Sequence, residues 1–320
     1  MRKIIIDTDP GHDDALAIML AVRSNQFDIQ AITTVCGNST IENTTRNTRY
    51  LLGLLEREDI PVYSGAKNPL QRELIQAIVH GKSGLDGIDP TNEAKLTGDA
   101  ADKIVEIVEG NPEEITLVTL GPLTNIARAI QKSPETMKKI REIIIMGGAI
   151  KVPGNKNRVA EFNIFVDPEA ADIVFRFPVK KTIVPLDACN NVRMYMEDFE
   201  KISNSRLRGP ILAMMKPFIV NISKDEGINA ALVYDALTVY YLLNPNACKV
   251  KSYDILVETG GELTRGMTVA DLRIKSESKN LINVVECINE NNFKQDFTSI
   301  ISKENLIKST KPKQNERRGH

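Results

Sequence analysis

Four aspartates lie within eight residues near the N-terminus, in the sequence Asp7-Thr8-Asp9-Pro10-Gly11-His12-Asp13-Asp14. The apolar run Ile4-Ile5-Ile6 precedes this octad, and a second run, residues 15–20 (ALAIML), follows it. The two runs predict a buried strand and a buried helix, joined by a Pro-Gly turn and with the last two aspartates in or next to the first helical turn. The carboxylates are therefore expected at the C-terminal end of a strand, where open α/β sheets bind ligands.

Carboxylates so close together repel one another, and burying them without a partner is costly. A hard divalent cation removes both penalties. Oxygen ligands suit Ca²⁺ or Mg²⁺, and Ca²⁺ accepts the larger and less regular shell. Asp13 and Asp14 alone could be residues that the helix dipole favours at an N-terminus. Four aspartates beside Pro-Gly instead indicate a metal site.

Strand-like and helix-like segments alternate along the next part of the chain. Their short connections predict an α/β fold in which a mostly parallel central sheet is flanked by helices on both faces, with an open Rossmann-like topology. Right-handed crossovers then place Asp9, Asn38, Leu120, Gly147 and Asp187 at one edge of the sheet. The expected strands span residues 27–35, 60–63, 115–120, 142–146 and 181–185, and the expected helices span residues 41–56, 99–109, 126–132 and 168–175.

The remaining segments have weaker patterns. Residues 71–90 form an irregular, glycine-containing loop around His80, and residues 197–243 are expected to be mainly helical. Strands return between residues 252 and 287, including 267–272, and a closing helix is expected over 292–307. We expect residues 1–308 to form a single domain and residues 309–320 to be a basic disordered tail or a cloning remnant.

Composition excludes several functional classes. A net charge of −1 gives no global field for nucleic acid or an anionic membrane. No apolar run reaches transmembrane length, and no signal peptide is expected. The four cysteines are far apart, as in reduced cytoplasmic proteins, and three histidines in the whole chain argue against a His/Cys zinc site.

The octad, with residues 121–125 (GPLTN) and 160–163 (AEFN), resembles the inosine–uridine-preferring nucleoside hydrolase family over residues 3 to about 306. Residues 146–148 (MGG), 167–170 (DPEA) and the loop around His80 also fall where the family has them. The resemblance implies the nucleoside hydrolase fold and hydrolysis of the N-glycosidic bond of ribonucleosides for nucleobase salvage. It also implies a homodimer or homotetramer.

In this family a Ca²⁺ ion lies at the bottom of the ribose pocket. By resemblance, its ligands here are Asp9, Asp14, Asp235 and the backbone carbonyl of Leu120, and Asp9 matches the general base. Without the resemblance, Asp235 would be expected to cap the helix that follows it. The positions that match ribose-binding residues are Asp13, Asn38, Asn155, Glu161 and Asn163, of which Asn38 and Asn155 are also common turn formers.

One position departs from the family pattern. Many members have a histidine directly before the last metal aspartate, where it protonates the leaving base, and this chain has Tyr234. The proton could come from Tyr234, through water or Tyr240, or from His80, which matches a loop histidine near the base. Alternatively the leaving group needs less help, as in a modified nucleoside, and Tyr234 only packs or stacks. Family members that are selective for purines often stack the base on tryptophan. This chain has none, which by resemblance favours a pyrimidine or a broad inosine–uridine preference, although Phe162 or Tyr234 could also stack on a purine.

Two other functions remain open. The run Ile4-Ile5-Ile6-Asp7-Thr8-Asp9 also resembles a haloacid dehalogenase-type phosphatase motif with Asp7 as nucleophile and Mg²⁺ as cofactor. However, Gly11 stands where that motif has Thr or Val, and the motif leaves Asp13 and Asp14 unexplained. A protein that binds nucleosides without turnover would have little need of Asp9 as a base.

Overall fold

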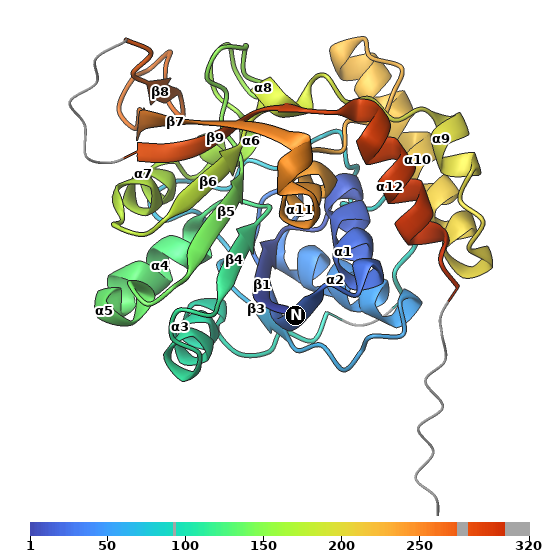
Figure 1. The fold of residues 1–320 in the computed structure, drawn as a ribbon, viewed down its shortest axis with the longest axis horizontal. Helices are drawn as coiled ribbons and strands as arrows, with labels where there is room; N and C mark the ends of the chain where they lie inside the picture. Colours follow the sequence, from blue (N-terminus) through green and yellow to red (C-terminus); the bar gives the residue numbers. More distant parts are fainter. Residues whose placement is uncertain (92–93, 274–280, 305–320) are drawn as a thin grey trace, which may run out of the picture.

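The computed structural model describes residues 1–91, 94–273 and 281–304, which include a nine-stranded sheet in the order β3-β2-β1-β4-β5-β6-β9-β7-β8 (Figure 1). All neighbours from β3 to β9 run parallel, whereas β7 is antiparallel to both β9 and β8. The mostly parallel sheet predicted from the sequence is confirmed. The strands are β1 (Arg2–Thr8), β2 (Phe27–Thr34), β3 (Val62–Ser64), β4 (Thr116–Thr119), β5 (Glu142–Met146), β6 (Lys181–Val184), β7 (Cys248–Val257), β8 (Thr268–Ala270) and β9 (Leu281–Ile288).

Helices cover both faces of this sheet (Figure 1). One face carries α1 (His12–Ser24), α2 (Ile41–Leu54), α10 (Ser205–Glu226), α11 (Tyr234–Leu243) and α12 (Glu290–Ser302). The other face carries α3 (Ala100–Gly110), α4 (Thr124–Lys132), α5 (Pro134–Met137) and α7 (Pro168–Arg176). The short elements α6 (Phe162–Val166), α8 (Leu186–Cys189), α9 (Met196–Glu200) and the 3₁₀ helix η1 (Pro245–Ala247) complete the described part.

Strand β1 divides the hydrophobic core into two layers. Ile4 and Ile6 pack on the side of α1, and Ile5 packs on the side of α3 and α4, because successive side chains of a strand point to opposite faces. All three are almost fully buried, and each contributes about 1.5–3 kcal/mol of hydrophobic stabilisation. This burial holds the end of β1, and hence the octad, in a fixed position.

Several predicted boundaries move by a few residues. The strand predicted at 60–63 begins at Val62, after Pro61, which lacks an N–H for the ladder. The strand predicted at 267–272 is limited to Thr268–Ala270, and the last helix begins earlier because Asn289 caps it by accepting from the N–H of Asn292 at 2.9 Å. That helix also ends earlier than the predicted residue 307, at Ser302, and Lys303 follows as its C-cap. The tail at 309–320 lies outside the described residues.

The loop at 71–90 contains no helix or strand, as predicted, and the carbonyl oxygen of Lys82 in this loop accepts from the hydroxyl of Ser39, which follows β2. Residues 197–243 are mainly helical, also as predicted. Within the described residues, no helix combines the length and apolar character that crossing a membrane requires.

Candidate active site

Carboxylates from two distant parts of the chain meet at the end of β1. Asp13 and Asp14 lie in the first turn of α1, and Asp235 lies in the first turn of α11, which packs against α1. Oxygen atoms of these three side chains lie within 4.8 Å of one another, and all three residues are buried. Helix N-termini favour such negative groups, but three in one place exceed what the dipoles alone stabilise.

Asp14 is held in place by the octad itself and by the end of β2. Its carboxylate accepts from the hydroxyl of Thr8 at 2.5 Å, the N–H of Gly11 at 2.9 Å and the side-chain amide of Asn38 at 3.0 Å. Asn38 thus contacts the acidic cluster and is not only a turn residue. The structure gives Asp235 no capping bond, because α11 begins one residue before it.

Asp9 lies next to this cluster, and within the described residues only one of its two carboxylate oxygens makes a hydrogen bond. Its Oδ2 accepts from the N–H of Asn38 at 2.7 Å, whereas the buried Oδ1 has no hydrogen-bond partner among the residues that the structure describes. Two glycines make room for the carboxylate, since a Cβ on Gly37 would lie 2.1 Å from Oδ2 and a Cβ on Gly121 2.4 Å from Oδ1. A buried carboxylate oxygen without a partner is what a bound cation would satisfy.

The electrostatics also fit a divalent cation. Burial, and next the charge of Asp14, raise the pKa of Asp13 to about 8 and the pKa of Asp9 well above its ordinary range. Burial and the three neighbouring aspartates raise the pKa of Asp235 in the same way. Leu120 lines the same cavity, and its carbonyl oxygen accepts from Asn163 Nδ2 at 2.7 Å. A carbonyl oxygen has a second lone pair that could bind a cation. The cluster can therefore bind a metal ion through oxygen ligands alone.

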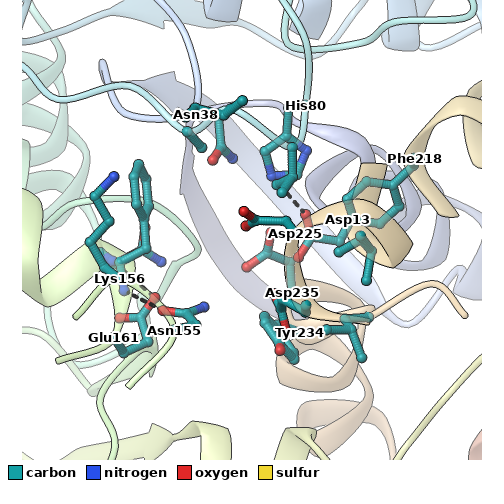
Figure 2. Close-up of a pocket in the computed structure, with 18 of the residues that line it drawn as sticks. Asp13, Asn38, His80, Asn155, Lys156, Glu161, Phe218, Asp225, Tyr234 and Asp235 are labelled. Carbon is teal, nitrogen blue, oxygen red and sulfur yellow. Dashed lines mark hydrogen bonds and ion pairs between the residues drawn. The ribbon is translucent and has the colours of Figure 1, made fainter. Parts of the chain in front are cut away.

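A cavity of about 260 Å³ opens above the carboxylates (Figure 2). Every residue predicted to bind substrate lines it, from segments spread over the chain, whereas Asp9 and Asp14 are not among its lining residues. The lining side chains predicted from the sequence are Asp13, Asn38, His80, Leu120, Asn155, Glu161, Phe162, Asn163, Tyr234 and Asp235.

Glu161 and its neighbours form one wall of the cavity. Glu161 caps α6 by accepting from the N–H groups of Asn163 at 2.9 Å and Ile164 at 3.2 Å, and it also accepts from Gly148 at 3.2 Å. Burial raises its pKa to about 7, although these backbone bonds oppose the rise. The side chain of Asn155 is held by the residue after Glu161, because its Oδ1 accepts from the N–H of Phe162 at 2.9 Å.

The opposite wall carries His80 and Tyr234. His80 Nε2 lies 3.9 Å from Asp13 Oδ1 (Figure 2), and burial lowers the pKa of its imidazole well below the usual value. The hydroxyl of Tyr234 donates to Asn190 at 3.1 Å. Tyr240 is not part of this wall, because its hydroxyl donates to Asp296 at 2.9 Å. A proton relay through Tyr240 is therefore excluded.

Asp7 does not take the position of a phosphatase nucleophile. Its buried Oδ1 accepts from Thr33 at 2.5 Å and from the side-chain amide of Asn125 at 2.8 Å, between neighbouring strand ends. The side chain ties β1 to β2 and to the start of α4, and it does not line the cavity. The phosphatase reading is therefore wrong.

Several lining residues were not recognised in the sequence. Helix α10 contributes Phe218, Ile222 and Asp225, which are four and three residues apart and so share one face of the helix. This spacing predicts a buried face, but it does not distinguish a core from a cavity wall. The other unrecognised lining residues are Ala77, Ile78, Val79, Met146, Lys156, Glu226 and Leu232.

Comparisons with known proteins agree with this geometry. Residues 4–295 match the family described as inosine-uridine preferring nucleoside hydrolase. A pyrimidine-specific ribonucleoside hydrolase from Citrobacter koseri is 40% identical over 296 residues, covering 91% of this chain and 95% of the relative. Among solved structures, a plant nucleoside hydrolase superposes with a TM-score of 0.89 at 32% identity, covering 95% of this chain and 99% of the other. A purine-preferring ribonucleoside hydrolase from Gardnerella vaginalis superposes with a TM-score of 0.86 at 28% identity, covering 94% and 98%.

Proposed function

The chain belongs to the inosine-uridine preferring nucleoside hydrolase family, and from this premise we propose that its cavity hydrolyses the N-glycosidic bond of ribonucleosides to ribose and a free base. The observation that carries the proposal is the buried cluster of Asp13, Asp14 and Asp235 beneath a cavity whose other wall presents Glu161 and Asn163. The end of the cavity at these carboxylates can bind a polyhydroxylated sugar, and the aromatic side chains that line the cavity can pack against a base.

Ribose is bound by carboxylate and amide groups. Asp13, Asn38, Asn155, Glu161 and Asn163 supply oxygens and N–H groups that exchange hydrogen bonds with the sugar hydroxyls. Each of these side chains is already oriented by the fold, so little ordering entropy is lost when the sugar binds. Carboxylates around the sugar also stabilise the positive charge that develops on it as the glycosidic bond breaks.

Asp9, Asp14, Asp235 and the carbonyl of Leu120 would hold the cation, which we propose is Ca²⁺ because the ligands are all oxygens and come from several elements. When bound, such an ion lowers the pKa of a water molecule and neutralises the carboxylates. Asp9 is also proposed as the general base that takes a proton from the attacking water, since within the described part of the chain no hydrogen bond occupies its Oδ1.

The base is proposed to be a pyrimidine. Phe162, Phe218 and Tyr234 line the cavity and can contact the base, and the chain has no tryptophan. The Citrobacter relative, which is named pyrimidine-specific, supports this preference more closely than the purine-preferring neighbour at 28% identity. His80 and Tyr234 are proposed to bind the base. Tyr234 is not proposed as the proton donor, since its hydroxyl donates its hydrogen to Asn190.

We also propose a cytoplasmic homodimer or homotetramer built from the single domain at 1–308. Apolar side chains at Leu256, Val269 and Leu281 are 42–57% exposed on the β7, β8 and β9 extension of the sheet, where a second copy could cover them.

The test is release of reducing sugar from uridine, cytidine, inosine, adenosine and guanosine, each with and without EDTA. Chelator-sensitive ribose release that is fastest with uridine or cytidine supports hydrolysis, the metal and the base preference together. Faster release from purine nucleosides overturns the base preference only. If a nucleoside binds in calorimetry but releases no ribose, the protein is a binder and the proposed catalysis is wrong.

A further inference from the structure

The hairpin formed by β7 and β8 packs behind the cavity wall that carries Glu161. None of its residues 248–270, all of which the structure describes, is among the residues that line the cavity. In β8, Thr268 is 1% exposed, whereas Val269, which points to the opposite face, is 45% exposed. The side chain of Thr268 therefore faces the interior of the molecule, towards the segment that follows β5.

The hydroxyl of Thr268 bonds to both backbone groups of Ala149. It accepts from the N–H of Ala149 at 2.9 Å and donates to the carbonyl oxygen of Ala149 at 2.7 Å. Ala149 is 3% exposed, so water does not replace these bonds if the hydroxyl is removed, and two buried backbone groups would lose a partner. The hydroxyl therefore fixes the chain at the residue directly after Gly148.

Gly148 connects this point with Glu161. The N–H of Gly148 donates to Glu161 Oε2 at 3.2 Å, and the φ of Gly148 is 90°, a conformation that glycine adopts readily. Thr268 also limits the position of this residue by contact, since a Cβ on Gly148 would lie 3.1 Å from Thr268 Cγ2. Because Ala149 is the covalent neighbour of Gly148, a shift of Ala149 moves the N–H that holds the carboxylate.

Two more residues of the hairpin contact the chain on either side of Glu161. Met267 forms an antiparallel bridge with Ala160, the residue before Glu161. The guanidinium group of Arg265 lies over the ring of Phe165, in α6, at 4.0 Å from the ring centroid. The same hairpin therefore holds the residue before Glu161, the helix after it and, through Thr268, the backbone that donates to its carboxylate.

We propose that Thr268 is a positioning residue that, through Ala149 and Gly148, holds the carboxylate of Glu161 where it accepts from a hydroxyl of the sugar. The identity of the ligand rests on the function proposed above. Glu161 accepts from three backbone N–H groups, and a carboxylate has about four acceptor positions, so one position remains for a hydroxyl. A hydrogen bond weakens steeply when it is misaligned, so recognition of that hydroxyl depends on how firmly Glu161 is held.

Discrimination between sugars tests the proposal. We measure kcat/KM for uridine and for its 2′-, 3′- and 5′-deoxy analogues, and the ratio that collapses in E161A identifies the hydroxyl that Glu161 binds. T268V should reduce discrimination against that same analogue about tenfold, the equivalent of one hydrogen bond, and should leave the other two ratios within about twofold. T268S keeps the hydroxyl and should restore the wild-type ratio. A general structural defect would not single out one hydroxyl.

Thr182 provides the matched control. It is a fully buried threonine in β6, and its hydroxyl has no hydrogen-bond partner among the described residues, so T182V makes the same chemical change without removing a bond. All three ratios should be unchanged in T182V. In an E161A background, T268V should cause no further loss of discrimination, because the effect of Thr268 passes through Glu161. An additional loss in the double variant contradicts the proposal.

Amide hydrogen exchange provides a readout that needs no turnover. The N–H of Gly148 should exchange about tenfold faster or more in T268V than in the wild-type protein, and it should be unaffected in T182V. If exchange responds in this way but no nucleoside is hydrolysed, the proposed function fails and the hold of Thr268 on Glu161 is confirmed.

Three results overturn the proposal: unchanged exchange in folded T268V, unchanged discrimination in a T268V protein that hydrolyses uridine, or an E161A variant in which no ratio collapses. If T268V fails to fold, R265A takes its place, because it changes a partly exposed side chain that contacts Phe165. R265A should then weaken discrimination against the same single analogue, and an R265A protein with wild-type ratios contradicts the proposal.

Discussion

The hydroxyl of Tyr234 donates its hydrogen to Oδ1 of Asn190, 3.1 Å away, and so directs it out of the cavity that the ring helps to form. Burial raises the pKa of this phenol well above its ordinary range, with the charge of Glu226 as the next cause. Both features make Tyr234 a poor donor of a proton to a leaving base. Its position directly before Asp235 places its ring in the cavity wall.

The first prediction concerns this hydroxyl. Y234F should keep kcat on the preferred nucleoside within about fivefold of wild type, because it removes one neutral hydrogen bond. Y234A, which also removes the ring, should raise KM more strongly. A fall of kcat by about a hundredfold or more in Y234F would instead identify the hydroxyl as an acid. Steady-state rates on uridine and cytidine distinguish the two outcomes.

The second prediction concerns the metal. Because Asp235 is buried beside Asp13 and Asp14, the metal-free protein contains repulsion that calcium relieves. Calcium at a hundredfold excess over its Kd should stabilise the wild-type protein by about 2.7 kcal/mol. D235N should raise the Tm of the EDTA-treated protein by about 2 °C or more, since one like charge is gone, and should lose the calcium-dependent increase. If D235N keeps the full calcium shift in calorimetry, Asp235 is not a ligand.

The third prediction uses the glycines around Asp9. G37A places a Cβ 2.1 Å from Asp9 Oδ2, so the carboxylate must move, and a shift of about 1 Å in a reacting group costs on the order of a hundredfold in rate. The matched control is G110A, because a Cβ at Gly110 meets nothing within 4 Å. We expect kcat/KM to fall about a hundredfold in G37A and to stay unchanged in G110A. Equal activity of both variants would mean that the position of Asp9 is unimportant.

The fourth prediction concerns the sugar. Asp13, Glu161 and Asn163 are buried polar groups that a missing hydroxyl would leave without a partner. We therefore expect kcat/KM for 2′-deoxyuridine to be lower than for uridine by about two orders of magnitude or more. Similar values for the two substrates would show that the cavity does not recognise the 2′-hydroxyl.

The fifth prediction concerns pH. The pKa of Glu161 is raised from its ordinary 4.5 to about 7 in the folded protein, so the folded state binds its proton more tightly than the unfolded state. The resulting stabilisation is fully present below about 4.5 and is lost as the pH rises through about 7. In calcium-free buffer, the Tm of the wild-type protein should fall more between these pH values than that of E161Q. Parallel Tm profiles would mean that Glu161 is not held in its neutral form.

Much of the fold follows from local sequence patterns. The apolar run at Ile4-Ile5-Ile6 and the alternation of strand-like and helix-like segments after it predicted the parallel sheet, since strand patterns and short connections are local properties of the sequence. The observed boundaries differ from the predicted ones by a few residues where a helix cap or a proline sets the end of the element, as at Asn289 and Pro61. The density of aspartates in the octad predicted a metal site because adjacent carboxylates repel whatever the rest of the fold may be.

Contacts between distant segments could not be predicted in this way. Nothing near Asp235 in the sequence shows that α11 packs on α1, and the face of α10 that carries Phe218 has the spacing of an ordinary core. His12 and His80 are separated by 68 positions, yet their Nδ1 atoms lie 3.1 Å apart, and His12 Nε2 lies 2.9 Å from the carbonyl oxygen of Asp86 in the loop that contains His80. Sequence therefore determined the chemical groups and their local elements. Tertiary packing decided which groups face one another, because hydrogen bonding and desolvation depend on distances that only the folded chain sets.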